Sequence, residues 1–282
     1  MRANGVDLCV ETFGDASSPA LLLIAGGAMA MDWWEDGFCE RLAAGPRHVI
    51  RYDHRDTGES VSYPPGAPGY TGADLVADAI GVLDALGIAR AHLVGMSMGG
   101  GIAQDAALVH PERVASLTLM STSPAVSDAS RPGLPPPSPR LAEHFAKPPP
   151  QPDWTDREAV IDYVVADRLA YVGSIPVDEI ELRALVARVV DRTPSMEAST
   201  ANQPPADEGE PVHGSLDEIR ASTLVIHGTE DPLFPVAHGE ALAAEIPDAR
   251  LLLLEGMGHE VPPRPLWDRV VPAILGHTAE GR

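Results

Sequence analysis

One serine of this sequence stands where a catalytic nucleophile would. The segment HLVGMSMGGG, residues 92–101, holds Ser97 in a G-x-S-x-G pattern between Gly95 and Gly99. The apolar run before it predicts a buried strand, and the run after it predicts a helix. Glycines on either side leave room for strand and helix to meet, so the serine can take a strained conformation that lifts its hydroxyl clear. The pattern favours a nucleophile over the alternative, a glycine-rich turn with an incidental serine.

A serine hydroxyl needs a base to take its proton, and that base needs a carboxylate to orient it. His259 lies in the glycine-rich segment LLLLEGMGHEVPP, after a predicted strand, and Asp231 follows another predicted strand in TLVIHGTEDPLFP. The order Ser, Asp, His along the chain is the one that a G-x-S-x-G elbow on an α/β sheet requires. We therefore predict a catalytic triad of Ser97, Asp231 and His259.

Each partner of the serine has competitors nearby. Glu230 precedes Asp231, but successive residues point in different directions, and the Asp-Pro turn favours Asp231 as the residue whose carboxylate is fixed. His227 ends a predicted strand and His238 begins a predicted helix, so we assign both to structural or surface positions. His259 is preferred because its glycine neighbours give the ring room to approach a hydroxyl.

Acyl transfer also needs hydrogen-bond donors for the oxyanion of its tetrahedral intermediate. One should be the backbone N–H of Met98, the residue after the serine. The other should come from the glycine-rich turn after the strand predicted in PALLLIAGGAMA, where we choose Gly27, with Ala28 as the second choice. The alternative is that this turn is tight but binds no ligand.

The elements that must position these residues alternate along the chain. Short apolar runs bounded by turn residues predict strands at 6–14, 19–27, 48–53, 91–96, 114–121, 222–228 and 249–256. Helical periodicity lies between several of them, as at 73–86, with Gly87 as a stop. The opening run alternates apolar and polar residues and predicts an antiparallel edge strand, whereas the later runs are apolar throughout. This predicts an α/β fold whose mostly parallel sheet has helices on both faces.

The strand pattern breaks after Ser121. Proline-rich segments follow, which exclude regular helix or sheet interior, and helical periodicity then returns at 156–173 and 177–192. We predict that residues 124–214 form a helical lid inserted between two strands, with 1–123 and 215–282 as the core. Apolar lid residues should overlook the serine, namely Val160, Tyr163, Val164, Leu169, Tyr171 and Leu182.

Composition and charge exclude several classes of partner. The 41 acidic and 20 basic residues give a net charge of −21, which repels phosphate backbones and anionic lipids. We expect no nucleic-acid partner and no membrane association, since no run approaches the ~20 apolar residues that span a bilayer. Cys9 and Cys39 are expected to be reduced, buried thiols, and with no signal peptide in view the prediction is a cytoplasmic location. The sequence leaves a homo-oligomer open.

These motifs resemble the α/β-hydrolase superfamily, and the resemblance spans nearly the whole chain. Within it, HVIRYDHRDTGES, GMSMGG and GMGHEVPP together resemble an actinobacterial esterase group that includes the anthracycline (aclacinomycin) methylesterases. Carried over by position, the resemblance implies the roles given above for Ser97, His259, Asp231, Gly27 and Met98. The chain departs from many members where Ala25-Gly26 replaces His-Gly, and its insertion is shorter and richer in proline than a polyketide-binding cap.

The resemblance also bears on two acidic residues. Asp53 and Asp56 lie in a loop that in this superfamily usually fixes a turn, so we expect a structural role rather than a metal site or a second acid.

The sequence thus predicts a serine hydrolase that cleaves carboxylic esters through an acyl-enzyme, without cofactor or metal. Methionines and a tryptophan near the predicted centre suit an apolar ester with a small to medium acyl group, and we expect Met29, Trp33 and Met96 to bind the substrate. Lactonases, carbon–carbon bond hydrolases and perhydrolases share the triad and remain alternatives. A ligand-binding protein on this fold without turnover is the alternative from another class.

Overall fold

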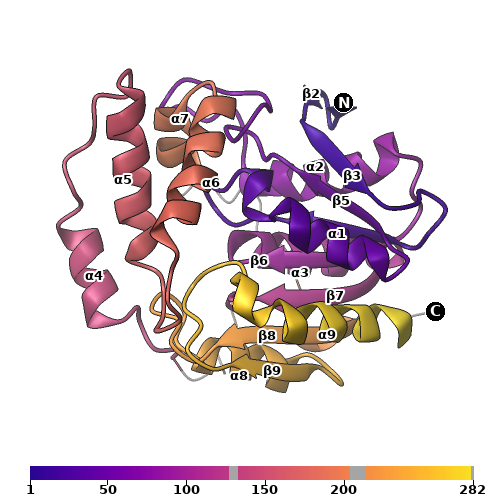
Figure 1. The fold of residues 1–282 in the computed structure, drawn as a ribbon. Coiled ribbons are helices and arrows are strands. Elements are labelled where there is room, and N and C mark those ends of the chain that lie inside the picture. Colours follow the sequence, from indigo (N-terminus) through magenta and orange to yellow (C-terminus); the bar gives the residue numbers. More distant parts are fainter. Residues whose placement is uncertain (127–132, 204–213, 281–282) are drawn as a thin grey trace.

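A seven-stranded sheet runs through the centre of the computed structural model, which describes residues 1–126, 133–203 and 214–280 (Figure 1). In space its strands follow the order β3-β5-β4-β6-β7-β8-β9. All neighbours are parallel except β3, which pairs antiparallel with β5. The strands are β3 (Val10–Phe13), β4 (Ala20–Ile24), β5 (His48–Tyr52), β6 (Ala91–Met96), β7 (Val114–Met120), β8 (Ser222–Gly228) and β9 (Arg250–Leu254). The predicted α/β class is confirmed.

The opening run differs in one respect from its prediction as a single strand. Its second half, β3, is the antiparallel edge strand expected, whereas its first half forms β2 (Val6–Asp7), which pairs with β1 (Arg2–Ala3) in a separate two-stranded sheet. Between these halves Leu8 is buried and the Cys9 backbone N–H bonds the Ser60 hydroxyl, so the chain leaves the ladder there.

Helices cover both faces of the sheet, and each face has its own apolar core. On one face α1 (Asp36–Ala44) lies against α9 (Trp267–Glu280), and on the other lie α2 (Gly72–Ala85), α3 (Met98–Val109) and α8 (Ala237–Glu245) (Figure 1). Alternate side chains of a strand point to opposite faces. On β4, Leu21 and Leu23 therefore join the α1–α9 core, while Leu22 and Ile24 join the other. Short 3₁₀ turns lie at Met31–Trp33, Pro111–Arg113, Leu216–Glu218 and Arg264–Leu266.

The chain between β7 and β8 carries four helices, which stand together beside the sheet (Figure 1). They are α4 (Pro139–Ala146), α5 (Arg157–Leu169), α6 (Glu179–Arg192) and α7 (Met196–Asn202). Aspartates cap the start of α5 and α6: Asp156 and Asp178 each accept two backbone N–H groups. The predicted insertion 124–214 includes these helices, and its residues 127–132 and 204–213 lie outside the described part of the chain.

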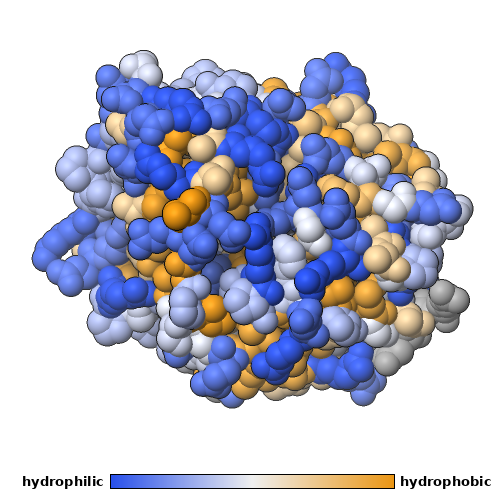
Figure 2. Space-filling model, viewed as in Figure 1, coloured by the Kyte–Doolittle hydropathy of each residue, from blue (hydrophilic) through white to orange (hydrophobic). Residues whose placement is uncertain are grey.

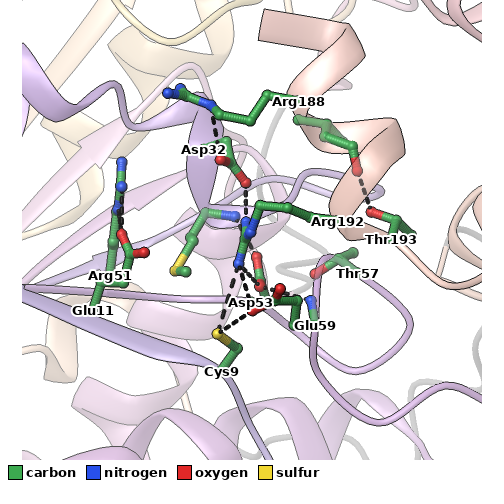
Figure 3. Close-up of polar contacts among 12 residues, drawn as sticks. Cys9, Glu11, Asp32, Arg51, Asp53, Thr57, Glu59, Arg188, Arg192 and Thr193 are labelled. Carbon is green, nitrogen blue, oxygen red and sulfur yellow. Dashed lines mark hydrogen bonds and ion pairs between the residues drawn. The ribbon is translucent and has the colours of Figure 1, made fainter.

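An ionic cluster joins α6 to the strand-bearing part of the molecule (Figure 3). The guanidinium of Arg192 contacts the carboxylates of Asp32 and Asp53, the latter at 2.8 Å, and Arg188 contacts Asp32 at 3.0 Å. The side chain of Asp53 is fully buried, and it also accepts the backbone N–H groups of Met31 and Glu59. Asp53 therefore has the structural role expected, because its carboxylate fastens the loop that follows β5 to α6.

The outer face seen in Figure 2 is mostly hydrophilic, with hydrophobic side chains scattered among the charged ones. Within the described part of the chain, no helix combines the length and the apolar character that crossing a bilayer demands.

Candidate active site

Ser97 stands at the corner between β6 and α3 with φ 53° and ψ −119°, a conformation that residues with a side chain rarely adopt. A Cβ atom on Gly95 would lie 2.1 Å from the carbonyl oxygen of Gly99, and one on Gly99 would lie 2.2 Å from that of Ile24. Both glycines are therefore required for α3 to approach the sheet this closely. The corner is held by the Ser97 N–H, which donates to the Met120 carbonyl at 2.9 Å.

The structure brings Ser97, His259 and Asp231 together from the carboxyl ends of β6, β9 and β8. His259 Nε2 lies 2.9 Å from Ser97 Oγ, and His259 Nδ1 lies 2.9 Å from Asp231 Oδ2. With Nδ1–H donating to the carboxylate, Nε2 is the acceptor for the serine hydroxyl proton. All three side chains lie at one edge of the sheet because parallel strands end there together.

The environment of Asp231 keeps its carboxylate ionised. Burial raises the pKa of Asp231. The hydrogen bond and charge of His259 and the N–H of Phe234 lower it by more than burial raises it, so the net pKa of Asp231 lies below its ordinary value. Its second oxygen, Oδ1, accepts the N–H groups of Leu233 and Phe234 at 2.9 and 2.8 Å. Glu230, by contrast, accepts the Ser174 hydroxyl at 2.8 Å and so points away from His259.

The other two histidines of this region serve structure. His227 is fully buried, and its Nε2 lies 2.7 Å from the Phe234 carbonyl oxygen, so it fixes the turn that follows Asp231. Burial also lowers the pKa of His227, which keeps the ring neutral. His238 is buried in α8 and bonds the Ser123 hydroxyl at 2.8 Å.

The turn after β4 lies directly against the serine. Ile24 pairs with Gly95 in the sheet, so the residues after both strands emerge side by side. A Cβ atom on Gly27 would lie 3.8 Å from the Met98 sulfur. Among the described residues, no acceptor lies within hydrogen-bonding reach of the backbone N–H of Gly27 or of Met98.

Ala28, the second choice for the oxyanion donor, is already engaged. Its N–H donates to the side-chain oxygen of Gln203 at 2.6 Å. Gln203 is buried, at 3% exposure, and lies just after α7, so a residue far along the chain occupies this donor. Of the two residues considered for this donor, Gly27 is therefore the one whose N–H is not taken by another residue of the described chain.

Two aromatic side chains flank the imidazole of His259. The Phe234 ring lies edge-on at 5.4 Å between centroids, and the Tyr171 ring lies at 6.0 Å. The His259 N–H also donates to the Tyr171 carbonyl at 2.8 Å, and a Cβ on Gly258 would lie 2.4 Å from that oxygen. Tyr171 was expected to overlook the serine; Phe234 was not identified, and its only sequence signal is its place three residues after Asp231.

Of the three residues predicted to bind substrate, Met29 and Met96 lie near the serine, and both are mostly covered. Met29 and Met96 are 4% and 1% exposed, and their sulfur atoms lie 2.8 and 3.0 Å from where a Gly26 Cβ would stand. Trp33 is partly buried and packs against both the α1–α9 core and the cluster between α5 and α6. The Arg168 guanidinium lies 5.2 Å from the Trp33 ring centroid.

The predicted lid residues divide between two surroundings. Val160 and Val164 are buried in the apolar cluster that α5 forms with α6. Within the described chain, Ala30 and Trp33 are the only residues of the strand-bearing part that join this cluster. The two valines therefore fill the space between helices rather than face the serine, as amphipathic stripes usually do. Tyr171 alone of the predicted set has a ring contact with His259.

The loop after β5 has no catalytic geometry. Asp56 Oδ1 accepts the Tyr63 N–H at 2.6 Å and Oδ2 accepts the Asn202 amide at 2.9 Å, a turn-fixing role of the expected kind. Of the two cysteines, Cys39 is buried as expected, whereas Cys9 is only partly buried, and both are free thiols. Within the described ranges, no three His, Cys, Asp or Glu side chains are grouped so as to hold a metal ion.

Known proteins resemble this chain along most of its length. A family model described as alpha/beta hydrolase fold matches residues 19–263. Rhodomycin D methylesterase DauP of Streptomyces sp. (strain C5) is 36% identical over 97% of this chain and 95% of that protein. A 2-hydroxymuconate semialdehyde hydrolase of Pseudomonas putida is 33% identical over 84% of this chain and 79% of that protein. The crystal structure of an esterase, RhEst1 from Rhodococcus sp. ECU1013, matches with a TM-score of 0.76 at 21% identity, over 99% of this chain and 97% of that one, which bears on the fold.

Proposed function

The chain belongs to the alpha/beta hydrolase fold family, and from that premise we propose that it hydrolyses carboxylic esters through an acyl-enzyme on Ser97. The observation that carries the proposal is the continuous hydrogen-bonded line from Asp231 through His259 to the Ser97 hydroxyl, with both contacts at 2.9 Å. The methylesterase relative supports an ester as the substrate, because it is similar over nearly its whole length.

The proposed reaction has two stages. His259 Nε2 takes the Ser97 proton as Oγ attacks the ester carbonyl carbon, and the N–H groups of Gly27 and Met98 bind the resulting oxyanion. The oxyanion then collapses, the bond to the alkoxy group breaks, and His259 gives its proton to the departing alcohol. Water attacks the acyl-enzyme in the second stage with His259 again as base, which releases the carboxylic acid and restores Ser97.

Asp231 serves this cycle by orienting the ring and stabilising its cation. Its lowered pKa keeps the carboxylate charged at neutral pH, so it can balance the imidazolium that forms in both stages. Its Oδ1 is held by two backbone N–H groups, so Oδ2 is fixed at His259 before substrate binds. This is preorganisation rather than a response to the substrate.

We further propose that residues 124–214 act as a lid over this centre, with 1–123 and 215–282 as the hydrolase core. The contact of Tyr171 with His259 supports the proposal, as does the packing of Trp33 against the α5–α6 cluster. Met29, Trp33 and Met96 then form the apolar side of the substrate site, which suits an ester with a small or medium acyl group.

A second reaction class is supported by the similarity to 2-hydroxymuconate semialdehyde hydrolase. Lactonase, carbon–carbon bond hydrolase and perhydrolase reactions use the same triad, so they are separated from ester hydrolysis only by the substrate.

The test combines labelling with turnover. Wild-type protein should be labelled at Ser97 by a fluorophosphonate and should hydrolyse a panel of p-nitrophenyl and methyl esters graded in acyl size. Ser97→Ala should lose both properties while keeping the circular dichroism and melting curve of the wild type. Undiminished ester hydrolysis by Ser97→Ala contradicts the nucleophile, and labelling without any turnover favours a ligand-binding protein.

A further inference from the structure

Gln203 makes a bridge between two loops that the proposed mechanism needs. Its side-chain oxygen accepts the Ala28 N–H at 2.6 Å, and its side-chain nitrogen donates to the Arg55 carbonyl at 2.7 Å. A donor on one side and an acceptor on the other fix which way the amide points. The side chain is 3% exposed, so these bonds are made without competition from bulk water.

The bridge acts on the residue next to the proposed oxyanion donor. Ala28 has φ +54°, a left-handed conformation that a residue with a Cβ atom adopts at a cost of roughly 1 kcal/mol. The hydrogen bond from its N–H to Gln203 compensates for that conformation. The Ala28 N–H belongs to the peptide group that joins Gly27 to Ala28, so its bond to Gln203 fixes the peptide group on one side of Gly27.

We propose that Gln203 is a positioning residue for the oxyanion hole. It engages the Ala28 N–H, holds the turn in its left-handed conformation and so aims the Gly27 N–H beside Met98 at the oxyanion of the reaction. The inference rests on the proposed function, because it concerns the charge that develops after attack by Ser97.

The other end of the bridge is a firm anchor. Arg55, whose carbonyl receives the Gln203 amide, makes a two-pronged ion pair with Asp78 at 2.7 and 2.8 Å, and both side chains are almost fully buried. The pair ties the loop after β5 to α2. Gln203 therefore connects the oxyanion turn to a rigid part of the fold rather than to a mobile surface.

The preceding residue offers a matched control. Asn202 is fully buried and also joins the end of α7 to the loop after β5, through the Asp56 carboxylate at 2.9 Å and the Gly66 N–H at 2.7 Å. Within the described ranges, Asn202 makes no hydrogen bond with the turn that contains Ala28. A variant of Asn202 thus disturbs the same attachment of α7 without touching the oxyanion turn.

The experiment compares Gln203→Met with Asn202→Ala and wild type. Gln203→Met keeps the length of the side chain and loses both hydrogen bonds. Removal of one oxyanion donor lowers kcat by about 10²–10³-fold, so a misaimed donor should lower it by roughly 10–100-fold with KM nearly unchanged. A trifluoromethyl ketone matched to the ester adds to Ser97 as an oxyanion, and its inhibition constant should rise by the same factor as kcat/KM falls. Asn202→Ala should keep kcat within about threefold of the wild type, even if it melts at a lower temperature. The Gly27 N–H stays in place in this variant and still stabilises the oxyanion.

The outcomes separate the inference from the function beneath it. A Gln203→Met enzyme with wild-type kcat overturns the inference, as does an equal loss of kcat in Asn202→Ala or an unchanged ketone inhibition constant. Should Gln203→Met fail to fold, Gln203→Asn, which is one methylene too short to reach both loops, replaces it with the same expectations. If wild type and Ser97→Ala hydrolyse the ester equally, the proposed function has failed; if Ser97→Ala is inactive, only Gln203 is in question.

Discussion

Replacing Arg192 by methionine should weaken the attachment of α6 to the strand-bearing part of the molecule, because it removes the cation that pairs with a buried carboxylate. The change leaves Asp53, whose side chain is fully buried, without a cation, although the N–H groups of Met31 and Glu59 still reach it at 2.7 and 3.0 Å. Asp32 keeps a second partner, Arg188, at 3.0 Å. The perturbation is therefore centred on one carboxylate.

The expected magnitude follows from that geometry. Removing one partner of a buried ion pair costs about 3–5 kcal/mol, and the two remaining N–H groups place this case near about 3 kcal/mol. For a chain of this size such a loss lowers the melting temperature by roughly 5 °C. Arg188→Met is the matched control on the same helix, because the Arg188 side chain is 42% exposed and ion pairs of exposed side chains contribute about 1 kcal/mol or less.

The loss should depend on pH. Burial raises the pKa of Asp53, and the charge of Arg192 partly offsets that rise, so the pKa of Asp53 rises further in the variant. A group whose pKa is raised on folding stabilises the fold at low pH, and that contribution is lost as pH rises through its folded-state pKa. The variant should therefore lose more stability relative to wild type at pH 8 than at pH 5, where Asp53 can bind a proton.

Melting curves of the wild type, Arg192→Met and Arg188→Met at pH 5 and pH 8 test this reasoning. Equal losses in the two variants would refute the assignment of a buried charge to Arg192. An Arg192→Met deficit that is the same at both pH values would refute the role given to Asp53 ionisation.

Three further predictions concern the site and the thiols. Asp231→Asn should lower kcat by about 10⁴-fold, because the amide presents N–H to the imidazole and fixes the wrong tautomer, and steady-state kinetics on a p-nitrophenyl ester will measure it. Gly99→Ala should abolish fluorophosphonate labelling, since its Cβ would lie 2.2 Å from a β4 carbonyl oxygen, whereas Gly101→Ala, whose Cβ meets nothing nearer than 3.9 Å, should label normally. Burial raises the pKa of Cys39 to about 12, so its thiol should resist iodoacetamide at pH 8 in the folded protein and react after denaturation in urea, as intact-mass spectrometry will show.

Local patterns in the sequence were enough to predict the parallel sheet and the residues that meet at its edge. A buried strand, a turn and a helix are each written in consecutive residues, and parallel strands must end at the same edge of a sheet. Ser97, Asp231 and His259 could therefore be chosen one loop at a time. The opening strand was predicted less well, because the break at Leu8 and Cys9 depends on a bond to Ser60 across the fold.

The contacts that local patterns missed join residues far apart in the chain. Gln203 and Ala28 are 175 positions apart, and Arg192 and Asp53 are 139 apart. Neither Gln203 nor Arg192 belongs to a motif, and a polar residue near the end of a helix usually faces solvent.

By itself, the sequence determined the order of the chemical groups along the chain. A hydroxyl on a glycine corner comes first, then a carboxylate and then an imidazole, each just after an apolar run. Only the tertiary structure decided that Gln203 takes the Ala28 N–H, that Glu230 bonds Ser174, and how the helices between β7 and β8 are fastened. The physical reason is range. Periodicity and turn chemistry act over a few residues, whereas burial and hydrogen-bond competition depend on everything that folding brings within a few ångströms.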